Sequence, residues 1–524
     1  MNTEGDLKDL KRKAMSRKRT VLFDNDGGDV AQLCQGTTDQ DLIDTRTKPA
    51  MDAGIDTYIY TTGWGFGIGL HDSQVGSVLR TKEGHLSKNR VADFTRNGTD
   101  CLRINSEYVK SSGKEFFWGM RMNDTHDAGY GNVFMPENRF KNDNPEVMFG
   151  KGIKHGAVTA VDYSEEKVRD FAVDYIMDVV DNYTIDGIFL DFFRHPIFFR
   201  SNANGLVATK DEIDAMNAFM RQVKGELDKR SMADETYYIT SVRVPDSVEY
   251  CYDIGLDIET WLKDELTDIL FTTSYLHLND WEYSARLAHK HGVPVYPSLD
   301  ESRARSEWPR HKRNSVRGYC GRIMNVWDAG CDGVFMFNNS GLRDMKLNIE
   351  QNWSSRTAGT YQEGLAATVK GKEFVNTLSK TYFANFRGVG AVAGGSLPHN
   401  DYINIPTLDH YAPIVIGKDK RTDVAIRISD TIKAAGEQGK TPSVTVNIFM
   451  FGDPDSVRVA INGSALDVKA SVNQHADLEQ DKTEYVLSAD ILVGLIKTGS
   501  NVFSFDADRE ITLLDMWVDL DYPG

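Results

Sequence analysis

The sequence predicts an α/β protein in which a (β/α)8 TIM barrel is followed by an antiparallel β-sandwich. The first observation is a series of eight β-rich apolar runs that alternate with helical stretches between residues 19 and 345. The second is a change, beyond about residue 398, to short segments in which apolar and polar residues alternate. The third is the absence of a GxGxxG motif, which the main alternative, a doubly wound sheet, usually carries after an early strand.

The eight runs have the composition of buried parallel strands, because most are apolar almost without interruption. They cover residues 20–24, 57–62, 116–123, 186–192, 237–243, 269–274, 293–297 and 333–338. Eight such strands joined by helices are the number that closes a barrel of this class. The loop Gly63–Gly69 follows the second run with the wrong glycine spacing for a phosphate turn, and we expect a flexible loop that carries Trp64 and Phe66.

The segments between the runs show the apolar spacing of helices. Ser164 is expected to be the N-cap of one helix, with Glu165 and Glu166 in the first turn, where carboxylates are favoured. Two further apolar stripes, Ile213–Leu227 and Val316–Trp327, follow a spacing close to 3.6 residues. These stripes predict helices that pack against the sheet.

The pattern divides the chain into four predicted parts. They are a charged N-terminal tail (1–18), the barrel (19–345), a linker with a helix (346–397) and the sandwich (398–524). Within the sandwich, strand-like alternation surrounds Asn462-Gly463, which is a strong hairpin signal.

The composition excludes several classes of protein. Lys and Arg total 60 against 77 Asp and Glu, and the net charge of −17 argues against a nucleic-acid groove. No stretch of about 18 apolar residues occurs, so we expect no membrane span. The charged N-terminus lacks the apolar core of a secretory signal; a secreted or periplasmic protein that has lost its signal would look the same as a cytoplasmic one.

Cysteine usage gives no sign of a metal knuckle, because no CxxC pair occurs. We expect five buried thiols, with a Cys34–Cys101 disulfide as the alternative. The five residues are Cys34, Cys101, Cys251, Cys320 and Cys331.

Candidate site residues are sought at the C-terminal ends of the barrel strands, where reacting groups of this fold lie. Carboxylates, amides, arginines and aromatic rings gather there, and together they suit a polyhydroxylated ligand. The expected ligand-binding residues are Trp118, Arg121, Asn123, Asp124, His126, Arg194, His195, Arg243, Tyr275, His277, Glu301 and Asn338.

Asp191 is the sharpest catalytic candidate, because it ends an apolar strand. Its alternative role is a structural carboxylate paired with Arg194 or Arg243. Glu249, after the next strand, is the preferred acid/base partner, and Glu301 is the alternative. Two carboxyl groups about 5–5.5 Å apart would make a retaining glycosidase.

Other chemistries have weaker signals. His126 joined by Asp124 and Asp127 lacks a standard metal-ligand spacing, so we expect neither a metal nor a cofactor. No GxSxG elbow is present for serine hydrolysis. The basic run between Arg303 and Arg313 is expected to be a solvated face, with contact to an anionic glycan as the alternative.

Four segments carry a family resemblance: Asp186–Pro196 (DGIFLDFFRHP), Ser241–Pro245, Gly255–Trp261 and Ala329–Phe335. They resemble glycosyl-hydrolase-like family 10 proteins, and the barrel is similar in outline to glycoside hydrolase family 168, the endo-α-1,3-fucanases. The resemblance covers residues 19–345 and says little about the sandwich. It implies a retaining glycosidase barrel in which Asp191 is the nucleophile and Glu249 the acid/base.

We therefore expect a retaining glycoside hydrolase that acts on a polysaccharide, with an endo-fucanase on sulfated fucan as the specific case. In this mechanism Arg243 keeps Asp191 ionised, because a nearby cation lowers the pKa of a carboxyl group. Two alternatives stay open: a non-catalytic glycan-binding protein with a degenerate barrel, and a metal-dependent lyase or aldolase.

Overall fold

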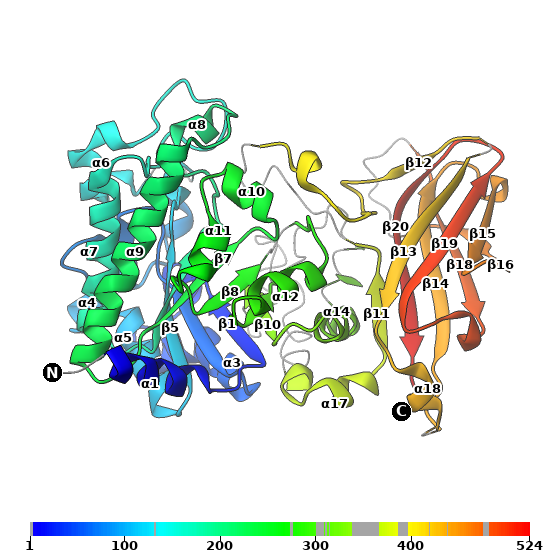
Figure 1. Cartoon of the computed structure of the whole chain (residues 1–524), viewed down its shortest axis with the longest axis horizontal. Helices are drawn as coiled ribbons and strands as arrows, with labels where there is room; N and C mark the ends of the chain where they lie inside the picture. The colour runs from blue at the N-terminus through cyan, green and yellow to red at the C-terminus, as the bar shows by residue number, and fades with distance from the viewer. Residues whose placement is uncertain are drawn as a thin grey trace.

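The computed structural model confirms the predicted fold class, a closed parallel barrel followed by an antiparallel β-sandwich (Figure 1). The barrel occupies the blue-to-green part of the chain in Figure 1, and the sandwich occupies the yellow-to-red part. The structure describes residues 4–129, 133–272, 276–299, 309, 312–313, 315–337, 366–385, 397–418, 420–437, 439–474 and 482–523.

Each of the eight predicted runs forms a strand of the barrel. The strands are β1 (Val21–Asn25), β2 (Thr57–Thr61), β5 (Glu115–Arg121), β6 (Gly187–Asp191), β7 (Ile239–Val244), β8 (Ile269–Thr272), β9 (Val295–Pro297) and β10 (Val334–Phe337). Their order is β10-β1-β2-β5-β6-β7-β8-β9, with parallel neighbours throughout. Ser298, just after β9, bridges Phe335 of β10, and the Leu299 N–H donates to the Phe335 carbonyl at 3.2 Å. The sheet therefore closes on itself, and all its carboxyl ends lie at one face.

Helices surround the barrel on the outside (Figure 1). They are α1 (Glu4–Met15), α2 (Asp39–Leu42), α3 (Lys48–Asp52), α4 (Val91–Arg96), α5 (Cys101–Ser111), α6 (Arg139–Asp143), α7 (Glu166–Asn182), α8 (Arg200–Ala203), α9 (Lys210–Ala233), α10 (Val248–Asp253), α11 (Ile258–Lys263), α12 (Trp281–His289) and α14 (Val316–Asp328). The three predicted helical stretches correspond to α7, α9 and α14. Within the predicted tail, α1 packs Leu7 and Leu10 against the core.

The start of α7 differs from the prediction by one residue. Glu165, not Ser164, occupies the N-cap position. The Ser164 hydroxyl instead donates to Asp162 at 2.7 Å, and Asp162 also pairs with Arg200 at 2.9 Å. Ser164 therefore stabilises the loop before the helix, because its side chain is already engaged there.

Three aromatic rings fill the inside of the barrel below its C-terminal face. Phe189 of β6, Phe271 of β8 and Phe335 of β10 are fully buried, with centroids 5.3, 5.3 and 4.6 Å apart. A barrel interior filled in this way is a packed core, not a pore. A ligand at the C-terminal face is therefore separated from the other end of the barrel.

The sandwich consists of two antiparallel sheets. One contains β11 (Lys380–Phe383), β20 (Ile511–Asp521), β14 (Ser443–Phe451), β18 (Glu484–Ile491) and β17 (Lys469–Val472), with β12 (Ile414–Ile416) beside β20. The other contains β13 (Arg421–Ile428), β19 (Gly499–Ala507), β15 (Val457–Ile461) and β16 (Ser464–Leu466). Asn462 and Gly463 form the predicted hairpin turn between β15 and β16, both with positive φ (48° and 87°).

Helix α14 joins the barrel to the sandwich. It packs against β11 (Figure 1). Cys320 and Met324 of α14 belong to the apolar core of the sandwich. A Cβ atom at Gly321 would lie 2.2 Å from the carbonyl oxygen of Thr381 in β11, so only glycine permits this approach. Both β11 and the short helix α17 (Lys372–Asn376) fall within the predicted linker.

Two cations of the predicted basic run do not lie on a solvated face. Arg313 is buried against the sandwich, where its guanidinium pairs with Asp515 at 2.9 Å and lies 4.6 Å from the ring centroid of Phe383. Lys312 reaches Asp519 at 3.2 Å. The prediction failed for these residues because the sequence does not show that the sandwich presents acidic partners. The other basic residues of the run lie outside the described residues.

All five cysteines are buried and free, as predicted, so the alternative Cys34–Cys101 disulfide is wrong. None of the helices in the described part of the chain has the length and apolarity that crossing a bilayer requires.

We predict that Arg313→Met lowers the stability of the whole chain by about 3–5 kcal/mol, because it removes the cation that faces the buried Asp515 carboxylate. Urea unfolding measures the change. The matched control is Arg458→Met, which breaks an exposed 3.0 Å pair with Asp508 and should leave the stability nearly unchanged, because solvent screens exposed charges. Equal effects of the two substitutions would contradict the prediction.

Candidate active site

Asp191 and Arg243 form the deepest part of the candidate site. Asp191 is the last residue of β6 and pairs in register with Arg243, the next-to-last residue of β7. Asp191 Oδ1 accepts hydrogen bonds from Arg243 Nε at 2.9 Å and from the N–H groups of Phe193 and Arg194 at 3.0 Å each, while Oδ2 contacts Arg243 Nη2. Both side chains are fully buried. The structure thus brings together the carboxylate and the cation that the sequence singled out.

Arg243 rests on aromatic rings. Its guanidinium carbon lies 4.1 Å from the ring centroid of Phe337 and 5.3 Å from that of Phe335, part of the aromatic layer below. Its Nη1 atom has no hydrogen-bond partner among the described residues. One donor of this buried cation is therefore not used by the described part of the chain.

Asp24, at the end of β1, is a site residue that the sequence reasoning missed. Its Oδ1 accepts a hydrogen bond from Thr61 Oγ1 at 2.9 Å, and Oδ2 has no partner within the described chain. Burial raises the pKa of Asp24 to about 7, although the charge of Arg243 opposes this; the charge of Asp191 adds to the rise. The rule that selected Asp191, an acid at the end of an apolar strand, would also have selected Asp24.

Two further arginines bind the next acid along the chain. Asp26 pairs with Arg46 Nη1 at 2.9 Å and with Arg121 Nη2 at 3.6 Å. Although burial acts to raise the pKa of Asp26, these two cations lower it to about 2. Asp24 and Asp26 therefore sit two residues apart with opposite pKa shifts.

Asp124 and His126, after β5, form a second hydrogen-bonded pair nearer the solvent. Asp124 Oδ1 accepts from the His126 N–H at 2.9 Å and from Nδ1 at 2.5 Å, while Oδ2 faces Arg121 Nη1 at 3.3 Å. His126 Nε2 lies 3.2 Å from Arg194 Nη2, which donates to it. Burial lowers the pKa of His126 despite the opposing effect of Asp124, so the ring is neutral near pH 7.

His195 completes this group from the loop after β6. Its φ of 59° lies in the left-handed region, a strained conformation that is uncommon outside glycine. Its Nδ1 accepts from the Thr125 N–H at 3.3 Å and lies 3.9 Å from Asp124 Oδ1. Its ring meets that of His126 edge-on at 5.1 Å, and burial with the charge of Arg194 holds its pKa well below the usual range.

Trp64 provides an aromatic wall beside the histidines. Its ring centroid lies 6.0 Å from that of His126 and 6.3 Å from that of His85, with the His85 ring stacked parallel to it. The loop that carries Trp64 and Phe66 was expected to be flexible, but both side chains are buried and Gly63 bridges Gly69.

Several predicted site residues lie elsewhere. Trp118 is a core residue: its Nε1 donates to Thr62 at 2.8 Å and its ring packs edge-on against Tyr175 of α7. Asn123 is buried, and its amide donates to two backbone carbonyls at 2.8 and 2.6 Å, so it braces the loop. His277 lies at a small cavity of about 40 Å³ between barrel and sandwich. Tyr275, Glu301 and Asn338 lie outside the described residues.

Glu249 is exposed in the first turn of α10 and accepts a hydrogen bond from Ser247 Oγ at 3.1 Å. An exposed position does not supply the desolvated surroundings expected of a protonated acid. Asp24, by contrast, is buried, and the charge of Asp191 helps to raise its pKa.

The structure also changes the set of residues able to hold a metal ion. The sequence suggested Asp124, His126 and Asp127, but Asp127 pairs with the buried Lys141 at 2.6 Å and accepts from Thr159 at 2.7 Å. His195 takes its place: one ligand atom from each of Asp124, His126 and His195 lies within 4.8 Å of the others. The sequence missed this set because the residues come from two different strand ends.

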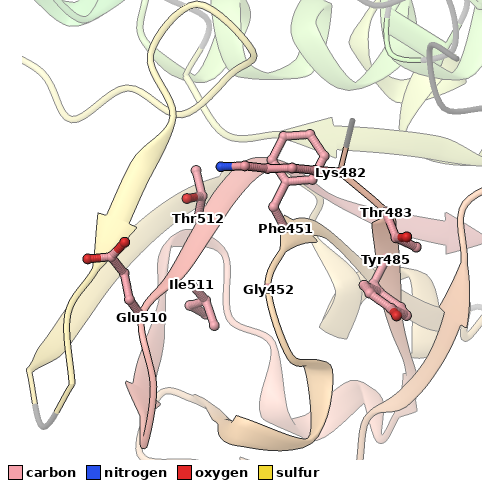
Figure 2. A pocket seen from close by; sticks show the side chains of 8 residues that line it. All are labelled: Phe451, Gly452, Lys482, Thr483, Tyr485, Glu510, Ile511 and Thr512. Atoms are coloured by element: carbon pink, nitrogen blue, oxygen red, sulfur yellow. The ribbon is translucent and has the colours of Figure 1, made fainter. Parts of the chain in front are cut away.

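The sandwich has a cavity of its own, with a volume of about 330 Å³ (Figure 2). Its lining includes Phe451, Tyr485, Lys482 and Glu510, and the Lys482 ammonium lies 5.9 Å from the ring centroid of Phe451. Trp517 of β20 is buried. The aromatic rings at this cavity are therefore Phe451 and Tyr485.

No protein-family model matches the chain, and no curated protein matches it. Among solved structures, the chain aligns with the galactosidase domain of an alpha-galactosidase-sucrose kinase at 13% identity and a TM-score of 0.36, covering 96% of this chain and 58% of that one. A family 18 chitinase from Chromobacterium violaceum aligns at 10% identity and a TM-score of 0.36, with 95% and 88% covered.

A family 27 β-L-arabinopyranosidase from Geobacillus stearothermophilus aligns at 10% identity and a TM-score of 0.36, covering 98% of this chain and 99% of that one. At such identities and TM-scores no activity transfers to this chain. The resemblance to glycosyl-hydrolase-like family 10 and to family 168 is not confirmed.

We predict that Asp24 makes stability depend on pH between about 4 and 7. Its folded pKa of about 7 lies above the ordinary value of 3.8, so the folded state holds the proton more tightly. The contribution of Asp24 to stability is complete below about pH 4 and is lost as the pH rises through 7, at up to about 1.4 kcal/mol per pH unit. Asp24→Asn should therefore gain stability relative to the wild type between pH 4.5 and 7.5.

Urea unfolding at several pH values measures this difference. Asp26→Asn is the matched control: because the pKa of Asp26 is lowered to about 2, its contribution changes only below about pH 4. A constant difference between Asp24→Asn and the wild type over the whole range would show that Asp24 does not titrate as stated.

Proposed function

We propose that the protein is a retaining glycoside hydrolase that acts on a polysaccharide at the C-terminal face of its barrel. The observation that supports this most directly is the pair Asp191 and Asp24: one carboxylate is ion-paired with Arg243, and the other has a pKa raised to about 7. A carboxylate held by a cation, together with a second acid whose pKa is raised, is the combination expected of a nucleophile and an acid/base.

In this proposal Asp191 attacks the anomeric carbon while Asp24, protonated, donates its proton to the leaving oxygen. The C–O bond breaks and a covalent glycosyl-enzyme forms; Asp24, now a carboxylate, then removes a proton from the water that releases the sugar. Arg243 Nη1, which has no hydrogen-bond partner among the described residues, would bind a substrate oxygen in this proposal. Asp24 replaces the sequence-based choice, Glu249, because Asp24 is buried and Glu249 is exposed.

The rim favours an anionic sugar chain. Arg194, His126 and His195 are partly exposed, and the ring of His126 lies 6.0 Å from that of the buried Trp64. A guanidinium group binds sulfate or carboxylate oxygens well. Sulfated fucans are therefore the first substrates to test, followed by other algal and plant polysaccharides.

We predict that Asp191→Gly loses hydrolysis by several orders of magnitude and that azide restores turnover of an aryl glycoside. The anion then attacks the anomeric carbon from the vacated side, and the product is a glycosyl azide of inverted configuration relative to the substrate. Mass spectrometry and NMR identify this product. A merely structural Asp191 would not give azide rescue.

Folding has to be separated from chemistry in this test, because Asp191→Gly leaves the buried Arg243 cation uncompensated at a cost of about 3–5 kcal/mol. The double variant Asp191→Asn/Arg243→Met removes both charges and should fold more stably than Asp191→Gly. If the double variant hydrolyses substrate at the wild-type rate, Asp191 is not the nucleophile.

The acid/base assignment has its own test. Asp24→Asn should lower kcat/KM on the natural polysaccharide by about 10²–10⁴-fold, and less on an aryl glycoside whose leaving group needs no proton. Glu249→Gln, its matched control, should change kcat/KM by less than about threefold, because its side chain is exposed and accepts a hydrogen bond from Ser247. The reverse pattern would restore Glu249 as the acid/base.

A glycan-binding protein without activity is the second candidate function. The observation in its favour is the hydrogen bonding of Asp191, whose two oxygens already contact Arg243 and two backbone N–H groups. Calorimetric binding to a polysaccharide that releases no reducing ends, across the whole panel, would establish this function and reject hydrolysis.

A further inference from the structure

We propose that Asp124, His126 and His195 bind a divalent transition-metal ion, with Zn²⁺ as the first choice. One carboxylate oxygen and one nitrogen from each imidazole lie within 4.8 Å of one another. Two histidines and one carboxylate form a common ligand set for such ions, since imidazole suits Zn, Cu, Fe and Ni. This inference goes beyond the proposed hydrolysis and does not depend on it.

The distances require only small adjustments. In a metal site with bonds of about 2.0–2.1 Å, ligand atoms lie roughly 3 Å apart. Asp124 Oδ1 lies 2.5 Å from His126 Nδ1 and 3.9 Å from His195 Nδ1. The first pair must open slightly and the second must close by less than about 1 Å, which rotation of two partly exposed imidazole rings supplies.

The surroundings orient the ligands. The Asp124 carboxylate is buried and held by Arg121 Nη1 at 3.3 Å and by the backbone N–H of His126 at 2.9 Å. The Thr125 N–H donates to His195 Nδ1 at 3.3 Å, so a metal ion on that nitrogen displaces this hydrogen bond. The partners of Asp124 are of the kind that sets ligand orientation around a metal. The left-handed backbone of His195, φ 59°, is the strained feature that aims its ring at Asp124.

The site has an open side. The side chains of His126 and His195 retain 15% and 24% of their exposure, while that of Asp124 retains 1%. An ion would thus be held from below by the carboxylate and from the sides by two rings. Three protein ligands leave a coordination position for water or a substrate oxygen, the arrangement typical of catalytic rather than structural metal sites.

Arg194 opposes the ion and provides a sharp test. Its Nη2 donates to His126 Nε2 at 3.2 Å, which requires the ring proton on Nδ1, where it faces Asp124. When the metal takes Nδ1, that proton moves to Nε2, so Arg194 must swing away. Arg194→Gln should therefore bind the metal more tightly than the wild type, whereas loss of a ligand weakens binding.

The experiment uses the full chain freed of metal by a chelator and titrated with ZnCl₂ by calorimetry, and with CoCl₂ by visible absorbance. We expect one site per chain. His195→Asn keeps a residue that tolerates positive φ and should weaken Zn²⁺ binding by at least about 100-fold, more than the loss of an outer partner usually costs. His126→Ala should do the same, and Arg194→Gln should strengthen binding by at least about threefold.

His289→Ala is the matched control, because His289 also lies next to an aspartate, Asp332, at 2.9 Å but belongs to no three-ligand group among the described residues. It should bind Zn²⁺ like the wild type. Melting curves establish that each variant is folded, and His195→Asn and His126→Ala are read independently, so misfolding of one leaves the other to decide. No Zn²⁺ or Co²⁺ binding by the wild type, or equal binding by His195→Asn and wild type, would overturn the proposal whatever the hydrolase assays show.

Discussion

The buried ion pair between Asp191 and Arg243 is the constraint on which the C-terminal face of the barrel depends. It ties neighbouring strands at their ends, covers the aromatic layer that fills the lumen, and places a charged group where solvent does not reach it. A buried charge is tolerated only with a close partner and further hydrogen bonds. Here two backbone N–H groups of the following loop supply those bonds, so the pair also fixes the course of that loop.

The acids of the site differ in their charged partners, and these partners explain their different chemistry. Asp24 has no ion-pair partner among the described residues, and burial raises its pKa, while Asp26 faces two arginines that lower its pKa. Asp124 is shared between Arg121 and His126. Acids of one residue type thereby acquire distinct properties from position alone.

Sequence reasoning could predict the barrel because each strand is a local apolar run, and it could predict Asp191 and Arg243 because both end such runs. It could not foresee that His195 would meet His126, since that contact joins loops after different strands. Ser164 was assigned to a cap that Glu165 occupies, because competition from Asp162 is a tertiary effect. Arg313 was expected in solvent because the facing Asp515 lies about two hundred residues later in the chain.

Because α14 packs on β11, the stability of the barrel and that of the sandwich depend on each other. Cys320 and Met324 contribute to the apolar core of the sandwich, and Gly321 allows the backbone of β11 to approach the helix. In an isolated barrel this apolar face of α14 would be exposed to water and would favour aggregation. Recombination that exchanged the sandwich for an unrelated module would therefore need a new partner surface for α14, so the two parts are expected to be inherited together.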